Sequence, residues 1–206
     1  MSRYRVASLD ELDRVPVQHG LEWRPVRRRL GVRSFGVNAY TSEKIGDWVV
    51  EEHKEGSGHE ELYIVLRGRA RFTLDGEELD APAGTIVFLP HSDVLRVAIA
   101  AEERTAVLAV GGWPGRAFEP SGWEWAFEAY GRADKGDVDG ALAVMQEWLT
   151  EHPDDGAALY NFACLECRVG RKDDALTHVR RALELRLDLK ERAREDPNLE
   201  PIKEEL

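Results

Sequence analysis

The sequence predicts an α+β protein in which an antiparallel β-barrel comes first and a set of α-helical hairpins follows. Two observations predict this order. Seven short segments rich in β-branched and apolar residues, separated by turn residues, lie between residues 32 and 110. Short strands at such spacing are typical of a sandwich or barrel. Beyond residue 122, alanine, leucine, glutamate and arginine dominate, and these residues favour helices.

Composition narrows the classes of protein that are compatible with the sequence. The chain has 206 residues, of which 43% are hydrophobic, enough to form a packed core. Its net charge of −11 argues against binding to nucleic acid or to an anionic membrane. No apolar run is long enough to span a bilayer, and the N-terminus lacks the pattern of a signal peptide. With only Cys164 and Cys167, which we expect to pack inside a helical pair, a cytoplasmic location is expected.

The N-terminal half is divided by turn and capping signals. Ser8 and Glu11 have the spacing of a capping box, which predicts a short helix to about Arg14 within an arm, residues 1–30, that packs on the barrel. The barrel itself is expected over residues 31–112 and a linker over 113–122. Asp75-Gly76 predicts a two-residue hairpin, because that turn needs positive φ at both positions. The expected strands cover residues 32–40, 48–52, 62–66, 70–74, 85–89, 94–99 and 106–110.

The helical part, residues 123–206, contains an internal repeat. Four residues of one segment recur 34 positions later: Gly136, Asp139, Ala141 and Leu142 match Gly170, Asp173, Ala175 and Leu176. This pattern resembles the tetratricopeptide repeat, whose period is also 34 residues. The resemblance implies two repeats, 122–155 and 156–189, a partial C-terminal unit, and binding of a partner protein or of a second copy of the chain.

Two segments of the β-rich part resemble the cupin superfamily. His59-Glu60-Glu61-Leu62-Tyr63-Ile64-Val65-Leu66-Arg67-Gly68 is similar to the core of the first cupin motif, and Gly84-Thr85-Ile86-Val87-Phe88-Leu89-Pro90 to the start of the second. The resemblance implies a small antiparallel cupin β-barrel, that is, a double-stranded β-helix. It also implies a homodimer, because cupin barrels often pair through edge strands.

The resemblance implies a metal-ligand set that this sequence only partly contains. In metal-binding cupins the first motif supplies two histidines and a glutamate, and the second motif a further histidine. Glu61 fills the glutamate position here. Counting from the motifs, Glu55 and Ser57 occupy the first two histidine positions and Leu95 the last, with Arg96 beside it. By this count no cofactor is predicted.

Neighbouring residues offer another ligand set. His59 lies two residues before Glu61, so both side chains point to one face of a strand. His53 and Glu55 are likewise two residues apart, and the glycines between the pairs would allow the chain to bend. A divalent transition metal on His53, Glu55, His59 and Glu61 therefore stays open, although Arg96 would place a positive charge nearby.

A second chemical alternative needs no metal. Some cupin epimerases use a histidine base and a tyrosine acid, and His59, Glu61 and Tyr63 alternate along one strand. The plainer interpretation is that Tyr63 fills the barrel and that Glu61 pairs with Arg96, since a buried carboxylate without a partner is costly.

These observations favour a protein that is not an enzyme. We expect the barrel to bind a small polar or anionic molecule and the helical repeats to bind a protein. The expected pocket residues are His53, Glu55, His59, Glu61, Tyr63 and Arg96. The alternatives are a metal-dependent oxygenase or isomerase, a metal-free epimerase, and a scaffold whose barrel is filled. The one basic cluster is expected to be a solvated strand face; it comprises Arg24, Arg27, Arg28, Arg29 and Arg33.

Overall fold

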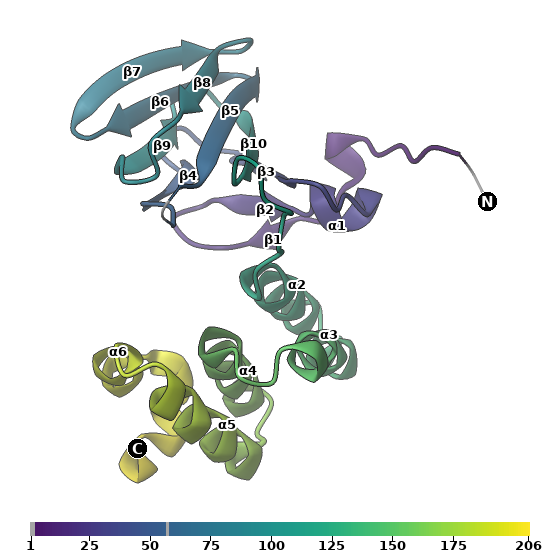
Figure 1. Cartoon of the computed structure of the whole chain (residues 1–206), viewed down its shortest axis with the longest axis vertical. Helices are drawn as coiled ribbons and strands as arrows, with labels where there is room; N and C mark the ends of the chain where they lie inside the picture. The colour runs from purple at the N-terminus through teal and green to yellow at the C-terminus, as the bar shows by residue number, and fades with distance from the viewer. Residues whose placement is uncertain (1–2, 57) are drawn as a thin grey trace. The chain divides into compact units, whose positions relative to one another are not determined.

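The computed structural model describes residues 3–56 and 58–206 and forms two compact units. The first, Met1–Pro120, is called the β-domain and contains all ten strands of the described chain; the second, Ser121–Leu206, is called the helical domain (Figure 1). The predicted fold class, antiparallel β-structure followed by packed α-helices, is confirmed.

The β-domain consists of two antiparallel sheets. The six-stranded sheet has the order β1-β2-β3-β10-β5-β8 and the four-stranded sheet the order β4-β9-β6-β7. The strands of the first sheet are β1 (Val15–Pro16), β2 (Glu22–Arg24), β3 (Gly36–Thr41), β10 (Ala106–Gly112), β5 (Glu60–Arg67) and β8 (Ile86–Leu89). Those of the second are β4 (Trp48–His53), β9 (Arg96–Ala100), β6 (Arg69–Leu74) and β7 (Glu77–Pro82).

The core of the β-domain combines large aromatic residues with small ones. Tyr63 and Phe72 are almost completely buried, and alanines of β6, β7, β9 and β10 face the same cluster. Alternation places these side chains inward: Tyr63 and Val65 of β5 are buried, whereas Leu66 is 44% exposed. The same alternation brings Glu61 to the inner side of β5.

The predicted Asp75-Gly76 hairpin is confirmed. It joins β6 to β7, which pair antiparallel with Leu74 opposite Glu77. Asp75 has φ of 48° and Gly76 has φ of 89°, as this two-residue turn requires.

Two expectations for the β-domain are wrong in detail, and one of its strands was not expected. The capping box yields only a 3-10 helix, η1 (Leu9–Glu11), without a side-chain cap from Ser8. The arginine cluster is not a solvated strand face: part of it forms helix α1 (Val26–Leu30), and both Arg24 and Arg27 are buried. Strand β7 was not expected, because its exposed, acidic residues lack a hydrophobic alternation.

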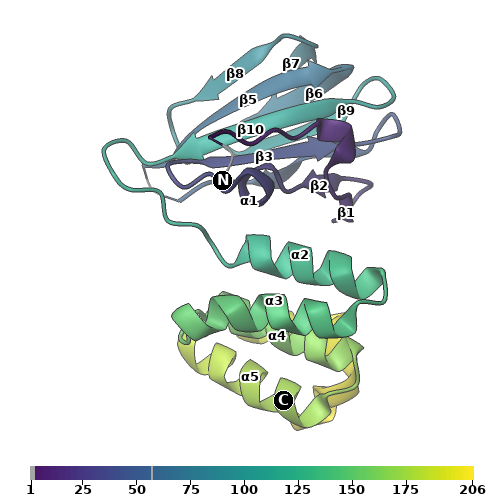
Figure 2. The same cartoon turned by 90° about the vertical axis from the view of Figure 1, so that its right-hand side faces the viewer.

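The helical domain contains two successive helix pairs, whose helices run lengthwise across the view in Figure 2. They are α2 (Trp123–Asp134) with α3 (Val138–Glu151), and α4 (Gly156–Arg168) with α5 (Lys172–Leu185). The 34-residue offset extends to the backbone, because the turn glycines Gly136 and Gly170 have φ of 84° and 83°. Cys164 and Cys167 are buried in α4.

The C-terminal segment packs on the second helix pair. Helix α6 (Leu189–Glu195) is followed by the 3-10 helix η2 (Pro197–Glu205), whose Leu199 and Ile202 are buried in the same core as α4 and α5. Asp196, between these two elements, accepts a hydrogen bond from the hydroxyl of Tyr160 at 2.8 Å. In the described part of the chain, no helix has the length and hydropathy that crossing a membrane requires.

Candidate functional site

His53 is placed by an irregular pair of strands. It ends β4 and lies opposite Arg96 of β9, and the register shifts between Val50 and His53. Such bulges bend a strand and redirect its side chains. The ring Nδ1 of His53 lies 2.8 Å from the backbone carbonyl of Glu51. If Nδ1 donates there, Nε2 keeps its lone pair and is available as a ligand or base.

Two carboxylates lie beside Nε2 of this imidazole. Nε2 of His53 lies 3.4 Å from Glu55 Oε1 and 3.9 Å from Glu61 Oε2. One potential ligand atom from each of the three residues lies within 4.8 Å of the others. Glu55 lies in the loop after β4. The backbone N–H of Glu55 donates a 2.9 Å hydrogen bond to the carbonyl of Ser92, and this bond holds the loop.

Glu61 is held from inside the sandwich by Tyr63. The Tyr63 hydroxyl donates a 2.5 Å hydrogen bond to Glu61 Oε2. Burial raises the pKa of Glu61 above its usual range, and the Tyr63 hydrogen bond opposes this only in part. Burial and the negative charge of Glu61 raise the pKa of Tyr63 well above its usual value. Tyr63 therefore orients Glu61 as a neutral phenol, and its hydroxyl is not free to protonate a ligand.

The other two members of the cluster form a charge pair. Burial lowers the pKa of His53, but the hydrogen bonds with Glu55 and with the Glu51 carbonyl, and the charge of Glu61, outweigh burial and raise it overall. Burial alone would raise the pKa of Glu55, but the hydrogen bond from His53 and the nearby cationic groups lower it overall. Glu55 is thus an anion near neutral pH.

Two more of the expected pocket residues adjoin the cluster. His59 Nδ1 lies 3.9 Å from Glu55 Oε2, and Arg96 Nη1 lies 3.9 Å from Glu61 Oε2. His59 is 8% exposed and Arg96 is fully buried. Among the described residues, His59 Nδ1 and both Nε and Nη1 of Arg96 have no hydrogen-bond partner.

The structure changes how the motif positions are assigned. The count from the second motif pointed to Leu95, but Leu95 is 39% exposed and Arg96 takes the inward position. The count from the first motif pointed to Glu55 and Ser57. Ser57 lies outside the described residues, and the side chain that joins Glu55 and Glu61 is that of His53.

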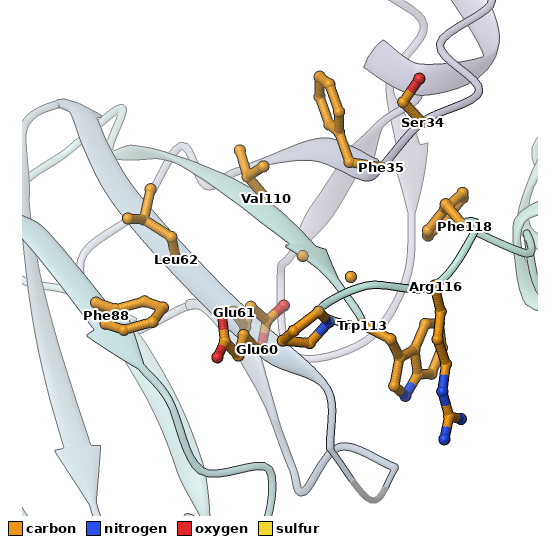
Figure 3. Close-up of a pocket in the computed structure, with 13 residues that line it drawn as sticks. Ser34, Phe35, Glu60, Glu61, Leu62, Phe88, Val110, Trp113, Arg116 and Phe118 are labelled. Carbon is orange, nitrogen blue, oxygen red and sulfur yellow. The ribbon is translucent and has the colours of Figure 1, made fainter.

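A pocket of about 300 Å³ that adjoins the cluster at Glu61 lies at the end of the six-stranded sheet, beside the chain that follows β10 (Figure 3). Sequence reasoning did not find this pocket. A signal for it lies in β8, where the apolar Phe88 alternates with the buried Val87 and Leu89 and is itself exposed. Its lining includes Phe35, Phe88, Trp113, Phe118 and Glu61.

The residues of the cluster fit a divalent metal ion. One imidazole nitrogen and two carboxylates are a mixed nitrogen and oxygen donor set that suits transition metals. The bond of His53 Nδ1 to a backbone carbonyl is the support that ligating histidines usually have. His59 Nδ1, buried and without a hydrogen-bond partner among the described residues, lies 3.9 Å from Glu55 Oε2 and adjoins this group of three without belonging to it.

No family model and no curated protein matches the sequence. Among solved structures, the chain is similar to a cupin protein from Bacteroides fragilis, with 22% identity and a TM-score of 0.42 over 59% of this chain and 93% of that one. It is also similar to a sugar phosphate isomerase of the cupin superfamily from Silicibacter pomeroyi, with 18% identity and a TM-score of 0.44 over 52% and 74%. A third is the cupin domain of an XRE-family transcriptional regulator from Enterobacter cloacae, with 12% identity and a TM-score of 0.39 over 46% and 98%.

These likenesses are too distant to assign a function, which has to be argued from the side chains of the site. The fold class rests on the two sheets themselves: the β-domain is an antiparallel sandwich of two sheets, followed by packed helices.

Proposed function

We propose that the β-domain binds a divalent transition-metal ion through His53, Glu55 and Glu61, and that this ion forms the floor of a site for a small molecule. One observation carries the proposal: the ligand atoms of these three residues lie within 4.8 Å of one another at one end of the sandwich. Exposed carboxylates often cluster without a metal, but Glu61 is buried and the His53 ring is held in place from behind.

The charge of the site supports a cation. Two carboxylates close together repel one another when both are ionised, and burial additionally disfavours the ionised form of Glu61. A divalent ion would neutralise both. Bound there, the ion would act as a Lewis acid that polarises a ligand oxygen.

The surrounding residues have supporting roles in this proposal. Tyr63 fixes one oxygen of Glu61 by its short hydrogen bond, and the carbonyl of Glu51 fixes the ring of His53. Supporting contacts of this kind typically change metal affinity by about 10–100-fold when they are removed.

A metal-free binding pocket is the second candidate function, and the raised pKa of His53 favours it. A protonated His53 would pair with Glu55, while Arg96 would balance Glu61, so the cluster would be neutral without an ion. In that case the β-domain would be a sensor for a small polar or anionic molecule and not an enzyme.

Elemental analysis of tag-free protein distinguishes these two candidates. A near-stoichiometric transition metal in the wild type, lost in His53→Ala and in Glu61→Gln, supports the metal site. The control variants are His91→Ala, an exposed histidine, and Glu60→Gln, the half-buried neighbour of Glu61, which should keep the metal. A wild-type protein that takes up no Zn²⁺, Mn²⁺ or Co²⁺ on dialysis would contradict the metal site and leave the sensor.

The helical domain is proposed to bind a protein. Two helix pairs with equivalent turn glycines stack in the manner of helical repeats, whose usual role is protein interaction. If this domain binds a partner, substitutions on the exposed faces of its helices should change the affinity for that partner. They should leave the metal content of the β-domain unchanged.

Self-association is proposed through strand β8. This strand is an edge of the six-stranded sheet, and its outward side chains Ile86 and Phe88 are 62% and 52% exposed. An apolar edge strand without charges is a site where another chain can pair. Sedimentation should show a dimer for the wild type and a monomer for Phe88→Glu; a wild-type monomer at micromolar concentration would contradict this proposal.

A further inference from the structure

Arg96 is the least satisfied charged side chain of the site. It is fully buried, and neither Nε nor Nη1 has a hydrogen-bond partner among the described residues. Its Nη2 reaches only the carbonyl of Ser92, at 3.5 Å, and its closest carboxylate oxygen, on Glu61, is 3.9 Å from Nη1. Burying a guanidinium with so few acceptors lowers the stability of the folded state. Its donors are therefore available for an acceptor that is not part of the chain.

His59 adds a second unused polar atom on the other side of the cluster. Its Nδ1 is buried, has no hydrogen-bond partner among the described residues, and lies 3.9 Å from Glu55. The ring is held by an edge-on contact with Trp113, at 4.8 Å between ring centres. The two carboxylates thus have unsatisfied nitrogens on both sides, Arg96 beside Glu61 and His59 beside Glu55.

The charge of the occupied site selects the kind of ligand. A divalent ion and Arg96 bring three positive charges, and Glu55 and Glu61 bring two negative ones. With His53 bound to the ion as a neutral imidazole, these charges leave one net positive charge beside the fully buried Arg96. Uncompensated buried charge is strongly disfavoured, so a ligand with one negative charge fits best.

We infer that the site takes a small monocarboxylate, whose carboxylate accepts hydrogen bonds from Arg96 beside the ion. This inference rests on the metal site proposed above. Arginine is well suited to such a group because its guanidinium presents several donors in one plane. Inorganic phosphate would offer similar acceptor oxygens but carries more than one negative charge near neutral pH, so we expect it to bind more weakly.

The inference makes the ion and the carboxylate interdependent. If each binds more tightly when the other is present, the two affinities must change by the same factor, since coupling is reciprocal. This reciprocity is a property that a purely structural role of Arg96 would not produce.

The test uses the full-length protein loaded with Co²⁺, whose visible absorption bands respond to its ligands. Acetate, glycolate, pyruvate and inorganic phosphate are titrated into the wild type, Arg96→Lys and Arg71→Lys. Arg96→Lys keeps the charge beside Glu61 but loses the guanidinium donors, and Arg71 is an exposed arginine of β6 that serves as control. Thermal unfolding and Co²⁺ content establish that each variant is folded and loaded.

We expect at least one carboxylate to change the bands saturably in the wild type and to increase its Co²⁺ affinity. Arg96→Lys should lower the affinity for that carboxylate by tenfold or more while its Co²⁺ content stays unchanged. Arg71→Lys should bind the carboxylate as tightly as the wild type does. Three results would overturn the inference and leave the metal site standing. They are Co²⁺-loaded wild-type protein that binds none of the three carboxylates, a response to phosphate only, and a carboxylate affinity that is the same in the wild type and in Arg96→Lys. Wild-type protein that holds no Co²⁺ would overturn the metal site and the inference with it.

Discussion

Gly111 offers a way to disturb the site without changing any of its functional groups. It lies in β10, opposite Glu61 of β5. A Cβ atom built on Gly111 would lie 2.4 Å from Cε1 and 2.9 Å from Nε2 of His59. Carbon atoms in contact are normally about 3.5–4 Å apart. In Gly111→Ala the imidazole must therefore withdraw by about 1 Å, and it must leave its present position beside Glu55.

The expected magnitude follows from that displacement. Residues that support a metal site typically contribute about 10–100-fold to its affinity, and a 1 Å misplacement is enough to lose a factor of this size. We expect Gly111→Ala to weaken Co²⁺ binding by at least about tenfold, which corresponds to about 1.4 kcal/mol. The new methyl group also lies 3.2 Å from the Glu60 carbonyl, so a small loss of stability is expected as well.

The adjacent residue is a matched control. A Cβ atom on Gly112 would meet nothing within 4 Å, and the substitution is equally close to the strand end. The assay is a Co²⁺ titration of wild type, Gly111→Ala and Gly112→Ala, with circular dichroism to show that all three are folded. If Gly111→Ala binds Co²⁺ as tightly as Gly112→Ala, His59 contributes nothing to the site and its unsatisfied Nδ1 needs another explanation.

Three further predictions concern the framework. The hydrogen bond with Glu166 outweighs burial and raises the pKa of His178. The stability that this pair contributes is therefore complete below the unfolded pKa of about 6.5 and is lost as pH rises through the folded pKa. Glu166→Gln should return the pKa of His178, measured by NMR, towards 6.5; an unchanged pKa would refute the pairing. Leu165→Ala, at a position 1% exposed in α4, should destabilise the helical domain by about 2–5 kcal/mol in urea unfolding followed at 222 nm. Gly76 has φ of 89°, and no atom lies within 4 Å of a Cβ built there, so Gly76→Ala should destabilise the β-domain by about 1 kcal/mol through backbone strain alone. Hydrogen exchange of β6 and β7 measures this loss, and unchanged exchange protection would argue against the strain.

The architecture was largely accessible from sequence because its signals are local. Apolar alternation marked the buried strands, Asp75-Gly76 marked a hairpin, and the repeated glycines marked equivalent turns. Helix α1 was missed although its ends carry recognisable signals: Pro25 precedes it and Gly31, with φ of 66°, ends it. The arginines of this segment concealed a buried face, because an Arg stem packs as an apolar group while its head finds a partner.

The site was less accessible because it depends on strand register. A motif count treats the chain as evenly spaced, but β4 and β9 pair with shifts of register before they bring His53 opposite Arg96. A shift of one residue exchanges the inward and outward positions of a strand. The shifts place the extra residues on β4 and so decide where His53 lies, whereas Arg96 faces inward by the regular alternation of β9, in which Ala98 and Ala100 are also buried. No local sequence signal specifies where such a bulge falls.

The C-terminal segment limits where the helical domain can bind a partner. A stack of only two helix pairs exposes apolar surface at its end, and repeat proteins need a cap there. Here the cap comes from the same chain, since Leu199 and Ile202 of η2 are buried in the core of the domain and Asp196 binds Tyr160 of α4. Because its own C-terminal segment covers that surface of α4, a partner would either have to displace η2 or bind elsewhere. Displacement would expose two fully buried apolar side chains, so the remaining faces of the helix pairs are the better place to look for an interface.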